Sequence, residues 1–484
     1  MFICMNKRQL FFLSIIVLSS SVLGFFMLTR GHVWPDDFAG YLLQAKSLLA
    51  WQMGDFISHN AFTIQNSSYP PGPLAYPWGF PLLLAPVYAL FGLNPLALKL
   101  LGVLFYAIFL VSFFYLARTR LPETESLLLT GVFSVLPGLL SATDLILSDI
   151  PFLAFSTLSL FFIEHLSRGK PRMGFLTGFC IFMAFFLRTN GILLFAPLVI
   201  SLSGSNWPRW QAALKRMLAP VLVFGGLLIL QIIWLPGGQE SYFSHFNMFT
   251  PQGLLDNILF YAWLPSWSFD RIPAGAALYP LLMVFVLISL VSHWRRDAAM
   301  HSYALLTLIL FSAWPERQGL RFIYPLLPFL LISALDGMLI FVASLRAGWQ
   351  KTALQVARGF WALMLVTCLF ISGQSAVGNM LNGRDINGPF DQYSKQLYAF
   401  LREKTPENAV IIFMRPRALR LFTARDAFMT ERCEDLRKGD YVALHEKVGD
   451  NGQISPDQVT TCNADVKLAL VFNNKRFTVY KIEK

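Results

Sequence analysis

Residues 10–29 read LFFLSIIVLSSSVLGFFMLT, an apolar run long enough to cross the hydrocarbon core of a bilayer as a helix. Lys7 and Arg8 precede it as they would in a secretory signal, but the run exceeds the usual signal core and no small-residue cleavage site stands out. We therefore expect a retained membrane anchor. Residues 32–43, HVWPDDFAGYLL, follow directly, and their adjacent acids Asp36 and Asp37 are costly near a bilayer unless they have a partner or face water.

Apolar runs of this kind recur along the chain. Of its 484 residues 55% are hydrophobic and only 14% are charged, whereas about a quarter of a soluble domain is charged. The sequence therefore predicts a polytopic α-helical membrane protein. About eleven transmembrane helices are expected, at residues 10–29, 97–117, 124–142, 149–166, 173–188, 190–204, 217–235, 275–293, 301–315, 320–343 and 357–377.

The connections between these runs alternate in charge. The basic connections carry Lys7, Arg8, Arg118, Arg120, Arg168, Lys170, Arg172, Arg209, Lys215, Arg216, Arg295, Arg296, Arg346, Lys351 and Arg358. The positive-inside rule makes these connections cytoplasmic, which places the N-terminus in the cytoplasm and the C-terminal part outside. The net charge of +11 is explained by this orientation, so we expect no nucleic-acid partner. The short apolar run at 79–92 would reverse the alternation if it crossed, so we expect it to lie on the outer face.

The predicted organisation is a transmembrane domain at 1–377, with outer loops at 30–96 and 236–274, and a soluble periplasmic α/β domain at 378–484. In that domain AVIIFM (409–414) and DYVALHE (440–446) are expected as strands. The runs KLALVF and RFTVYKI are expected to form a β-hairpin around Asn473 and Asn474. The stretch PRALRLFTARDAF is expected as a helix. Cys433 and Cys462 share the oxidising side, which favours a disulfide over two buried thiols.

Charged residues collect at the outer membrane level. Asp36 and Asp37 follow the first run, and Asp149 begins the fourth. Each has a structural alternative, because one acid of the pair can cap the following helix, and Asp149 stands at a helix start that favours a negative charge.

Three arginines, Arg188, Arg317 and Arg321, lie at the same level. They can snorkel to lipid headgroups or bind a phosphate with their planar guanidinium groups. No P-loop, G-x-S-x-G or H-E-x-x-H motif is present, so nucleotide hydrolysis and the common hydrolase chemistries lack support.

Five segments, taken in order, resemble the bacterial GT-C membrane glycosyltransferases, the superfamily of the protein O-mannosyltransferases and the aminoarabinose lipid A transferases. They are WPDDFAGYLLQAKSLL, YPWGFPLLLAPVYALFG, LSDIPFLAFSTLSLFF, LRTNGILLFAP and QGLRFIYPLLPFLL, and they cover essentially the whole membrane part. One departure stands out. The aminoarabinose transferases carry a Lys where this chain has Tyr76, before Pro77 and Trp78.

The resemblance implies a GT-C-like fold and an inverting glycosyltransferase at the periplasmic face of a bacterial inner membrane. It would move a hexosyl or pentosyl unit from a polyprenyl-phosphate donor to a hydroxyl of a glycolipid, polymer or protein. The implied catalytic acids are Asp36, the general base, and Asp37, and a divalent metal ion would be held by Asp149 and Asp36. The implied substrate-binding residues are Arg188, Arg317, Arg321 and Tyr76.

A lipid-linked sugar flippase or another polytopic transporter is the alternative of a different class. Transporters usually show related halves and interrupted helices near the bilayer midplane. Here the charges lie at one face, and a soluble outer domain follows. These features favour the transferase.

Overall fold

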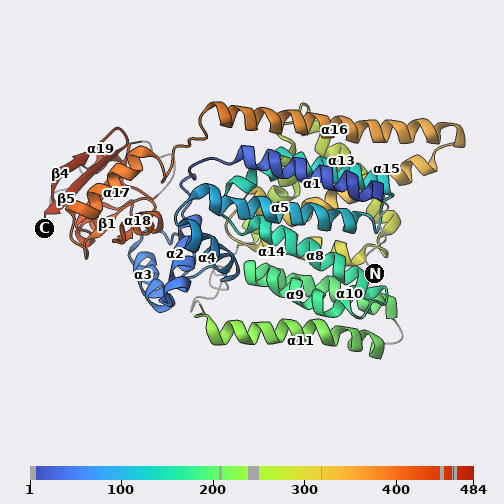
Figure 1. The fold of residues 1–484 in the computed structure, drawn as a ribbon, viewed down its shortest axis with the longest axis horizontal. Coiled ribbons are helices and arrows are strands. Elements are labelled where there is room, and N and C mark those ends of the chain that lie inside the picture. Colours follow the sequence, from blue (N-terminus) through green and yellow to red (C-terminus); the bar gives the residue numbers. More distant parts are fainter. Residues whose placement is uncertain are drawn as a thin grey trace.

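The chain folds into a bundle of apolar helices with a small sheet domain at one end (Figure 1). The computed structural model describes residues 7–206, 210–237, 250–317, 319–446, 452–459, 462 and 466–483. Part of the predicted outer loop 236–274 and Gln318 lie outside the described residues. We call the end of the bundle that carries the sheet domain the docking end; it corresponds to the predicted periplasmic side.

Seven helices in the described part of the chain are long and apolar enough to cross a bilayer. They are α1 (Lys7–Met27), α5 (Pro95–Ala117), α8 (Asp149–Ser167), α11 (Trp210–Trp234), α13 (Gly275–His293), α15 (Leu327–Ser344) and α16 (Ala347–Leu381). An eighth candidate is bent by 54° between α6 (Glu123–Val135) and the segment formed by α7 (Pro137–Leu140) and the 3-10 turn η1 (Ser141–Asp144). Pro137 explains this break, because its ring removes a backbone donor and clashes with the preceding turn.

The remaining three predicted runs form shorter apolar helices. These are α9 (Met173–Leu187), α10 (Phe195–Asn206) with the preceding turn η2 (Thr189–Leu194), and α14 (Ala298–Ala313). All eleven predicted runs are therefore helical. The structure does not confirm eleven crossings, since seven or eight helices have the required length.

Several short helices gather at the docking end. They are α2 (Asp37–Ala50), α3 (Met53–Asn66), α4 (Gly79–Phe91), α12 (Pro251–Trp263), η4 (Leu264–Phe269), η5 (Leu320–Phe322) and η6 (Tyr324–Leu326). The run predicted to lie on the outer face is α4, which packs against α2 between the bundle and the sheet domain (Figure 1).

The described part of the sheet domain begins with α17 (Gln392–Lys404) and contains five strands in the order β2-β1-β3-β5-β4. The strands are β1 (Val410–Ile412), β2 (Asp426–Phe428), β3 (Tyr441–His445), β4 (Lys467–Asn473) and β5 (Phe477–Glu483). The predicted strands at β1 and β3 and the terminal hairpin β4–β5 are confirmed. The prediction of a helix over PRALRLFTARDAF is wrong for the second half of this stretch. There α18 (Pro416–Thr423) stops at Ala424, whose φ is +59°, and β2 follows.

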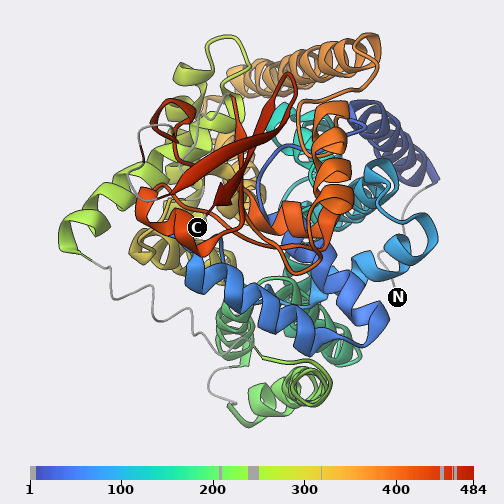
Figure 2. The same cartoon turned by 90° about the vertical axis from the view of Figure 1, so that its left-hand side faces the viewer.

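The described part of the sheet domain also contains α19 (Pro456–Val459) and η7 (Cys433–Lys438). The predicted disulfide between Cys433 and Cys462 is present. Figure 2 shows the sheet domain covering the docking end of the bundle. Contacts from the loop 30–96 hold it there: Thr63 donates to the carbonyl of Ala427 at 2.8 Å, and Arg415 donates to the carbonyl of Trp34 at 3.0 Å.

Candidate active site

Five of the predicted side chains meet at the docking end. Asp37 begins α2, Asp149 begins α8, Arg188 follows α9, Arg321 lies in η5, and Tyr76 lies between α3 and α4. Arg321 donates to Asp37 at 2.7 Å (Nη2 to Oδ2), and its Nε lies 3.9 Å from Oδ1 of Asp149. Tyr76 donates its hydroxyl hydrogen to the other Asp37 oxygen at 2.7 Å. Segments far apart in the chain thus converge on one cluster of charges.

The pairing of Asp149 with Arg188 completes this cluster. Asp149 stands in the first turn of α8, but Arg188 binds its Oδ1, so its main partner is a guanidinium. The ring of Phe322 lies beneath both arginines, with centroid distances of 4.8 Å to Arg188 and 5.9 Å to Arg321. Aromatic faces attract cations at such distances. Phe322 therefore keeps the two guanidinium groups close together at the docking end.

Two carboxylates and two guanidinium groups balance one another in the cluster. Burial alone would raise the pKa of Asp37, but the charge of Arg321 and its hydrogen bond hold that pKa below its ordinary value. Burial opposes the charge of Arg321 too, and Asp149 and Asp37 more than compensate, so the pKa of Arg321 is raised. The Nε of Arg321 is buried without a hydrogen-bond partner in the described structure. Its interaction with Asp149 at 3.9 Å is thus an ion pair without a hydrogen bond.

Asp36 points away from this cluster. Its Oδ1 accepts a hydrogen bond from the backbone N–H of Ala418 at 3.2 Å, and its Oδ2 lies 3.9 Å from Nε of Arg417. Both partners belong to α18 of the sheet domain. The Asp36 side chain is 8% exposed, against 22% for Asp37. Burial, only partly offset by Arg417, raises the pKa of Asp36 to about 6.

The helix-cap interpretation of the acidic pair is wrong for Asp36. It precedes α2 but makes no side-chain hydrogen bond to that helix, and it binds the start of α18 instead. The two adjacent acids therefore have different partners: Asp36 contacts the sheet domain, and Asp37 contacts the bundle.

Arg317 lies apart from the other predicted residues. It donates to Oδ1 of Asn257 at 2.9 Å and stacks over Phe260 at 4.8 Å. It borders a cavity of about 410 Å³ beside α12 and the end of α14. Within the described residues, the structure shows no contact of Arg317 with Asp37 or Asp149.

The comparisons with solved structures settle the fold. ArnT from Cupriavidus metallidurans in the apo state matches 96% of this chain and 97% of its own, with a TM-score of 0.60 and 15% identity. ArnT bound to undecaprenyl phosphate matches the same shares with a TM-score of 0.57 and 13% identity. The apo oligosaccharyltransferase of Archaeoglobus fulgidus matches 90% of this chain and 69% of its own, with a TM-score of 0.55 and 11% identity. This chain has the GT-C fold. No protein-family model and no curated protein sequence matches it.

The predicted metal ligands at the docking end, Asp36 and Asp149, do not form a paired site. Asp36 is bound to Ala418 and Arg417, and Asp149 is bound to Arg188. The two carboxylates face different guanidinium groups, and Oδ2 of Asp36 makes no hydrogen bond in the described structure. The residues present thus do not fit a divalent ion held by this pair, although one structure of the archaeal oligosaccharyltransferase is a complex with Zn and sulfate. We derive no step through a metal.

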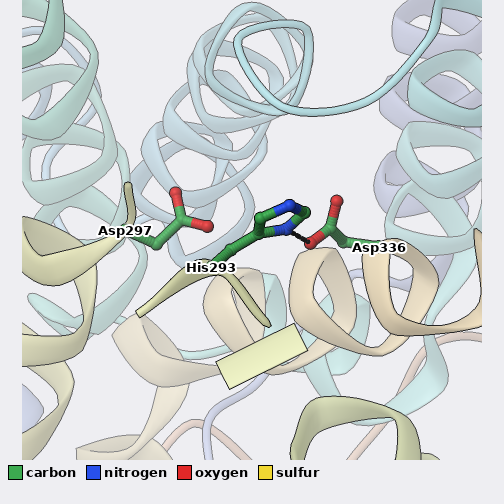
Figure 3. A group of neighbouring side chains, drawn as sticks. All are labelled: His293, Asp297 and Asp336. Carbon is green, nitrogen blue, oxygen red and sulfur yellow. Dashed lines mark hydrogen bonds and ion pairs between the residues drawn. The ribbon is translucent and has the colours of Figure 1, made fainter. Parts of the chain in front are cut away.

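One group of three potential metal ligands exists among the described residues, at the other end of the bundle. It consists of His293 at the end of α13, Asp297 before α14 and Asp336 in α15, and Figure 3 shows His293 beside Asp336. Arg296 donates to both carboxylates, at 2.7 Å and 3.0 Å, and Arg120 donates to Asp297 at 2.7 Å. Two arginines thus supply the positive charge, and the group ties helix ends together.

Two residues at the docking end could not be predicted from the sequence. Arg417 reaches the site from the sheet domain, where an arginine in an amphipathic helix looks like an ordinary surface residue. Tyr41 lies 3.0 Å from the hydroxyl of Ser148 and ties α2 to the start of α8. The apolar spacing of α2 indicated a buried face but could not identify its partner.

Proposed function

We propose that the chain is an inverting glycosyltransferase that moves a sugar from a polyprenyl-phosphate donor to an acceptor hydroxyl at the periplasmic face of a bacterial inner membrane. The observation that carries this proposal is the pairing of Asp37 with Arg321, beside Asp149 and Arg188, at one end of an apolar bundle. A structural neighbour with the same fold is bound to undecaprenyl phosphate, which supports a lipid phosphate as the donor group.

Arg321 and Arg188 are the proposed phosphate ligands. A guanidinium fits a phosphate because its donors lie in one plane, and charge-assisted hydrogen bonds are strong. The Nε of Arg321, which makes an ion pair with Asp149 but no hydrogen bond, is one such donor. Tyr76, expected to bind substrate, already donates to Asp37, so we assign it a supporting role.

Asp37 is the proposed general base, in place of Asp36. It is the more exposed of the two acids, and its low pKa keeps it ionised at neutral pH. Asp36 is buried against the sheet domain, and its Oδ2, which makes no hydrogen bond, faces Arg417, so an acceptor hydroxyl has less access to it than to Asp37.

The proposed transfer step conserves charge within the cluster. The acceptor O–H bond breaks and its proton goes to Asp37, while the acceptor oxygen bonds to C1 of the sugar from the side opposite the phosphate. The C1–O bond to the phosphate breaks, and its electron pair stays on the leaving phosphate. Protonation neutralises Asp37 as the phosphate gains a negative charge, so Arg321 can transfer its interaction from the carboxylate to the leaving group. Stabilising charge that develops in the transition state is a large catalytic term.

The remaining assignments of the proposal concern substrates. The sugar is a hexosyl or pentosyl unit, and the acceptor is a glycolipid, a polymer or a protein. Arg317 and its polar cavity, which includes Thr250, Asn257 and Ser312, form a second contact surface for one of these substrates.

A radiolabel transfer assay tests the function. Purified protein in liposomes would receive a panel of polyprenyl-phosphate sugars with lipid, polymer and protein fractions, and we expect label in one fraction. Arg188→Met should lose this transfer, whereas Arg384→Met should keep it, because Arg384 lies at the same membrane end but packs on Phe25. Donor that crosses the bilayer with its sugar–phosphate bond intact would instead identify a flippase.

A further inference from the structure

We propose that the sheet domain is part of the catalytic apparatus: Arg417 is a positioning residue that orients Asp37 through the hydroxyl of Tyr76, and Asp36 anchors α18 beside it. The link to catalysis rests on the role proposed for Asp37 above. The positioning itself can be measured without any transfer activity.

Arg417 is inserted into the loop between α2 and α4, and its side chain is 1% exposed. It donates to the side chain of Asn60 at 2.9 Å and to the carbonyl oxygens of Pro71 at 3.3 Å and Pro73 at 2.6 Å. It also donates to the hydroxyl of Tyr76 at 3.1 Å. A buried arginine with this many partners fixes the loop that surrounds it, because each lost contact would leave a buried polar group unpaired.

The contact with Tyr76 decides the direction of a hydrogen bond. A guanidinium can only donate, so the Tyr76 oxygen must accept from Arg417, and its single hydrogen is left for Asp37. Burial raises the pKa of Tyr76 well above its ordinary value, which keeps this hydrogen in place. The guanidinium also lies over the Tyr76 ring at 5.4 Å. Arg417 therefore fixes both the ring and the hydroxyl hydrogen that holds the Asp37 carboxylate.

Asp36 makes the second connection. It accepts from the backbone N–H of Ala418 in the first turn of α18, where the helix carries partial positive charge. Because Asp36 and Asp37 are adjacent in the chain, the position of α18 also fixes the backbone from which the Asp37 side chain extends.

Two glycines make room for this arrangement. A Cβ on Gly40 would lie 2.7 Å from the Tyr76 ring, and a Cβ on Gly72 would lie 2.8 Å from both the Tyr76 hydroxyl and the Arg417 guanidinium. Gly72 has φ +135°, a backbone conformation that disfavours other residues. The close packing of Tyr76 and Arg417 thus depends on positions without side chains.

The test compares Arg417→Met with a matched control in the full chain. Arg425→Met is the control, because Arg425 is a buried arginine just after α18 whose side chain bonds Thr405, Arg402 and Thr423 inside the sheet domain. We expect Arg417→Met to lower kcat by roughly 10- to 100-fold with little change in donor KM, as a misplaced catalytic group does. The acid limb of the pH–rate profile, where the rate falls as Asp37 becomes protonated, should move to higher pH in Arg417→Met. The reason is that the Tyr76 hydrogen bond that lowers the pKa of Asp37 is weakened.

Tyr76→Phe provides a second, milder variant. It should shift the acid limb in the same direction. The double variant Arg417→Met/Tyr76→Phe should lose much less kcat than the product of the two single losses, since both changes interrupt the same hydrogen-bond chain to Asp37. Independent losses that multiply, or an unchanged pH profile in both single variants, would overturn the positioning role. Equal losses in Arg417→Met and Arg425→Met would overturn it as well.

Amide hydrogen exchange gives a readout independent of transfer. In the wild type we expect the amides of α2 and of Ala418 to be protected, and Arg417→Met and Gly40→Ala to speed their exchange at least tenfold while the amides of α8 are unaffected. Unchanged exchange in both variants would overturn the proposal. A wild type without transfer activity but with this exchange pattern would refute the proposed function and leave the positioning intact.

Discussion

Replacing Arg321 by Met removes the cation that lies between Asp37 and Asp149. The variant loses a hydrogen bond of 2.7 Å from a charged donor to Asp37, and such bonds contribute about 1.5–3 kcal/mol. Converted to a protonation equilibrium, this free energy corresponds to a rise of roughly one to two units in the pKa of Asp37. Burial then acts on Asp37 without its main opposing charge, so its pKa rises from its depressed value. The unbranched Met side chain follows the methylene stem of Arg321 and has a similar volume, so the change is mainly one of charge and hydrogen bonding.

The assay is the pH dependence of kcat/KM for sugar transfer between pH 4 and 9. We expect the acid limb of Arg321→Met to lie about one to two pH units above that of the wild type. At pH 8 a loss of about 10- to 150-fold should remain, since the leaving phosphate has lost a ligand. Arg321→Lys, which keeps a charge, should shift the limb less. An acid limb that does not move in Arg321→Met would refute the pairing of Arg321 with the catalytic carboxylate.

Asp36, Lys99 and the Cys433–Cys462 disulfide each make a contact outside the charged cluster. Asp36→Asn should keep the sheet domain docked, because an amide oxygen can accept a hydrogen bond from α18. The raised pKa of Asp36 means that the stability of the wild type falls as pH rises from about 4 to about 6. Melting curves of the variant over this pH range should lack the fall. Lys99→Met should lower the apparent Tm strongly, by the equivalent of about 3–5 kcal/mol, because it leaves Asp144 without its 2.7 Å partner; an unchanged Tm would contradict this. Replacing Cys433 and Cys462 by Ser should cost about 3–4 kcal/mol through loss of a closed loop, and alkylation of both thiols in the denatured wild type without reductant would show that no bridge exists.

The helices were predictable from the sequence because apolarity sustained over about twenty residues is itself the requirement for a membrane helix. Their number of crossings was not, since α9, α10 and α14 are apolar but short, and Pro137 divides α6 from α7. Hydropathy measures composition along the chain and does not show where a helix begins or bends.

The site was predictable in its residue types and only partly in its geometry. Asp37, Asp149, Arg188 and Arg321 could be singled out because charged side chains at the membrane level need partners or a function. The different directions of Asp36 and Asp37 could not be read from the sequence, because they depend on where α18 docks.

Arg417 shows the same limit more sharply. It lies far from Asp36 along the chain, at position 417 against position 36. Nothing in PRALRLFT distinguishes it from Arg420 on the same helix. Only the packing of the sheet domain against the loop 30–96 brings it to Tyr76.

The central claim is that Asp37 takes the proton of the acceptor during sugar transfer from a polyprenyl-phosphate donor. The most direct measurement is single-turnover transfer of labelled sugar by purified wild type, Asp37→Asn and Asp36→Asn at pH 7.5, with donor in excess over its KM. We predict that Asp37→Asn lowers the rate by about 100- to 10,000-fold, the usual range for loss of a general base, while Asp36→Asn stays within about threefold of wild type. Wild-type rates in Asp37→Asn, or a larger loss in Asp36→Asn, would contradict the claim.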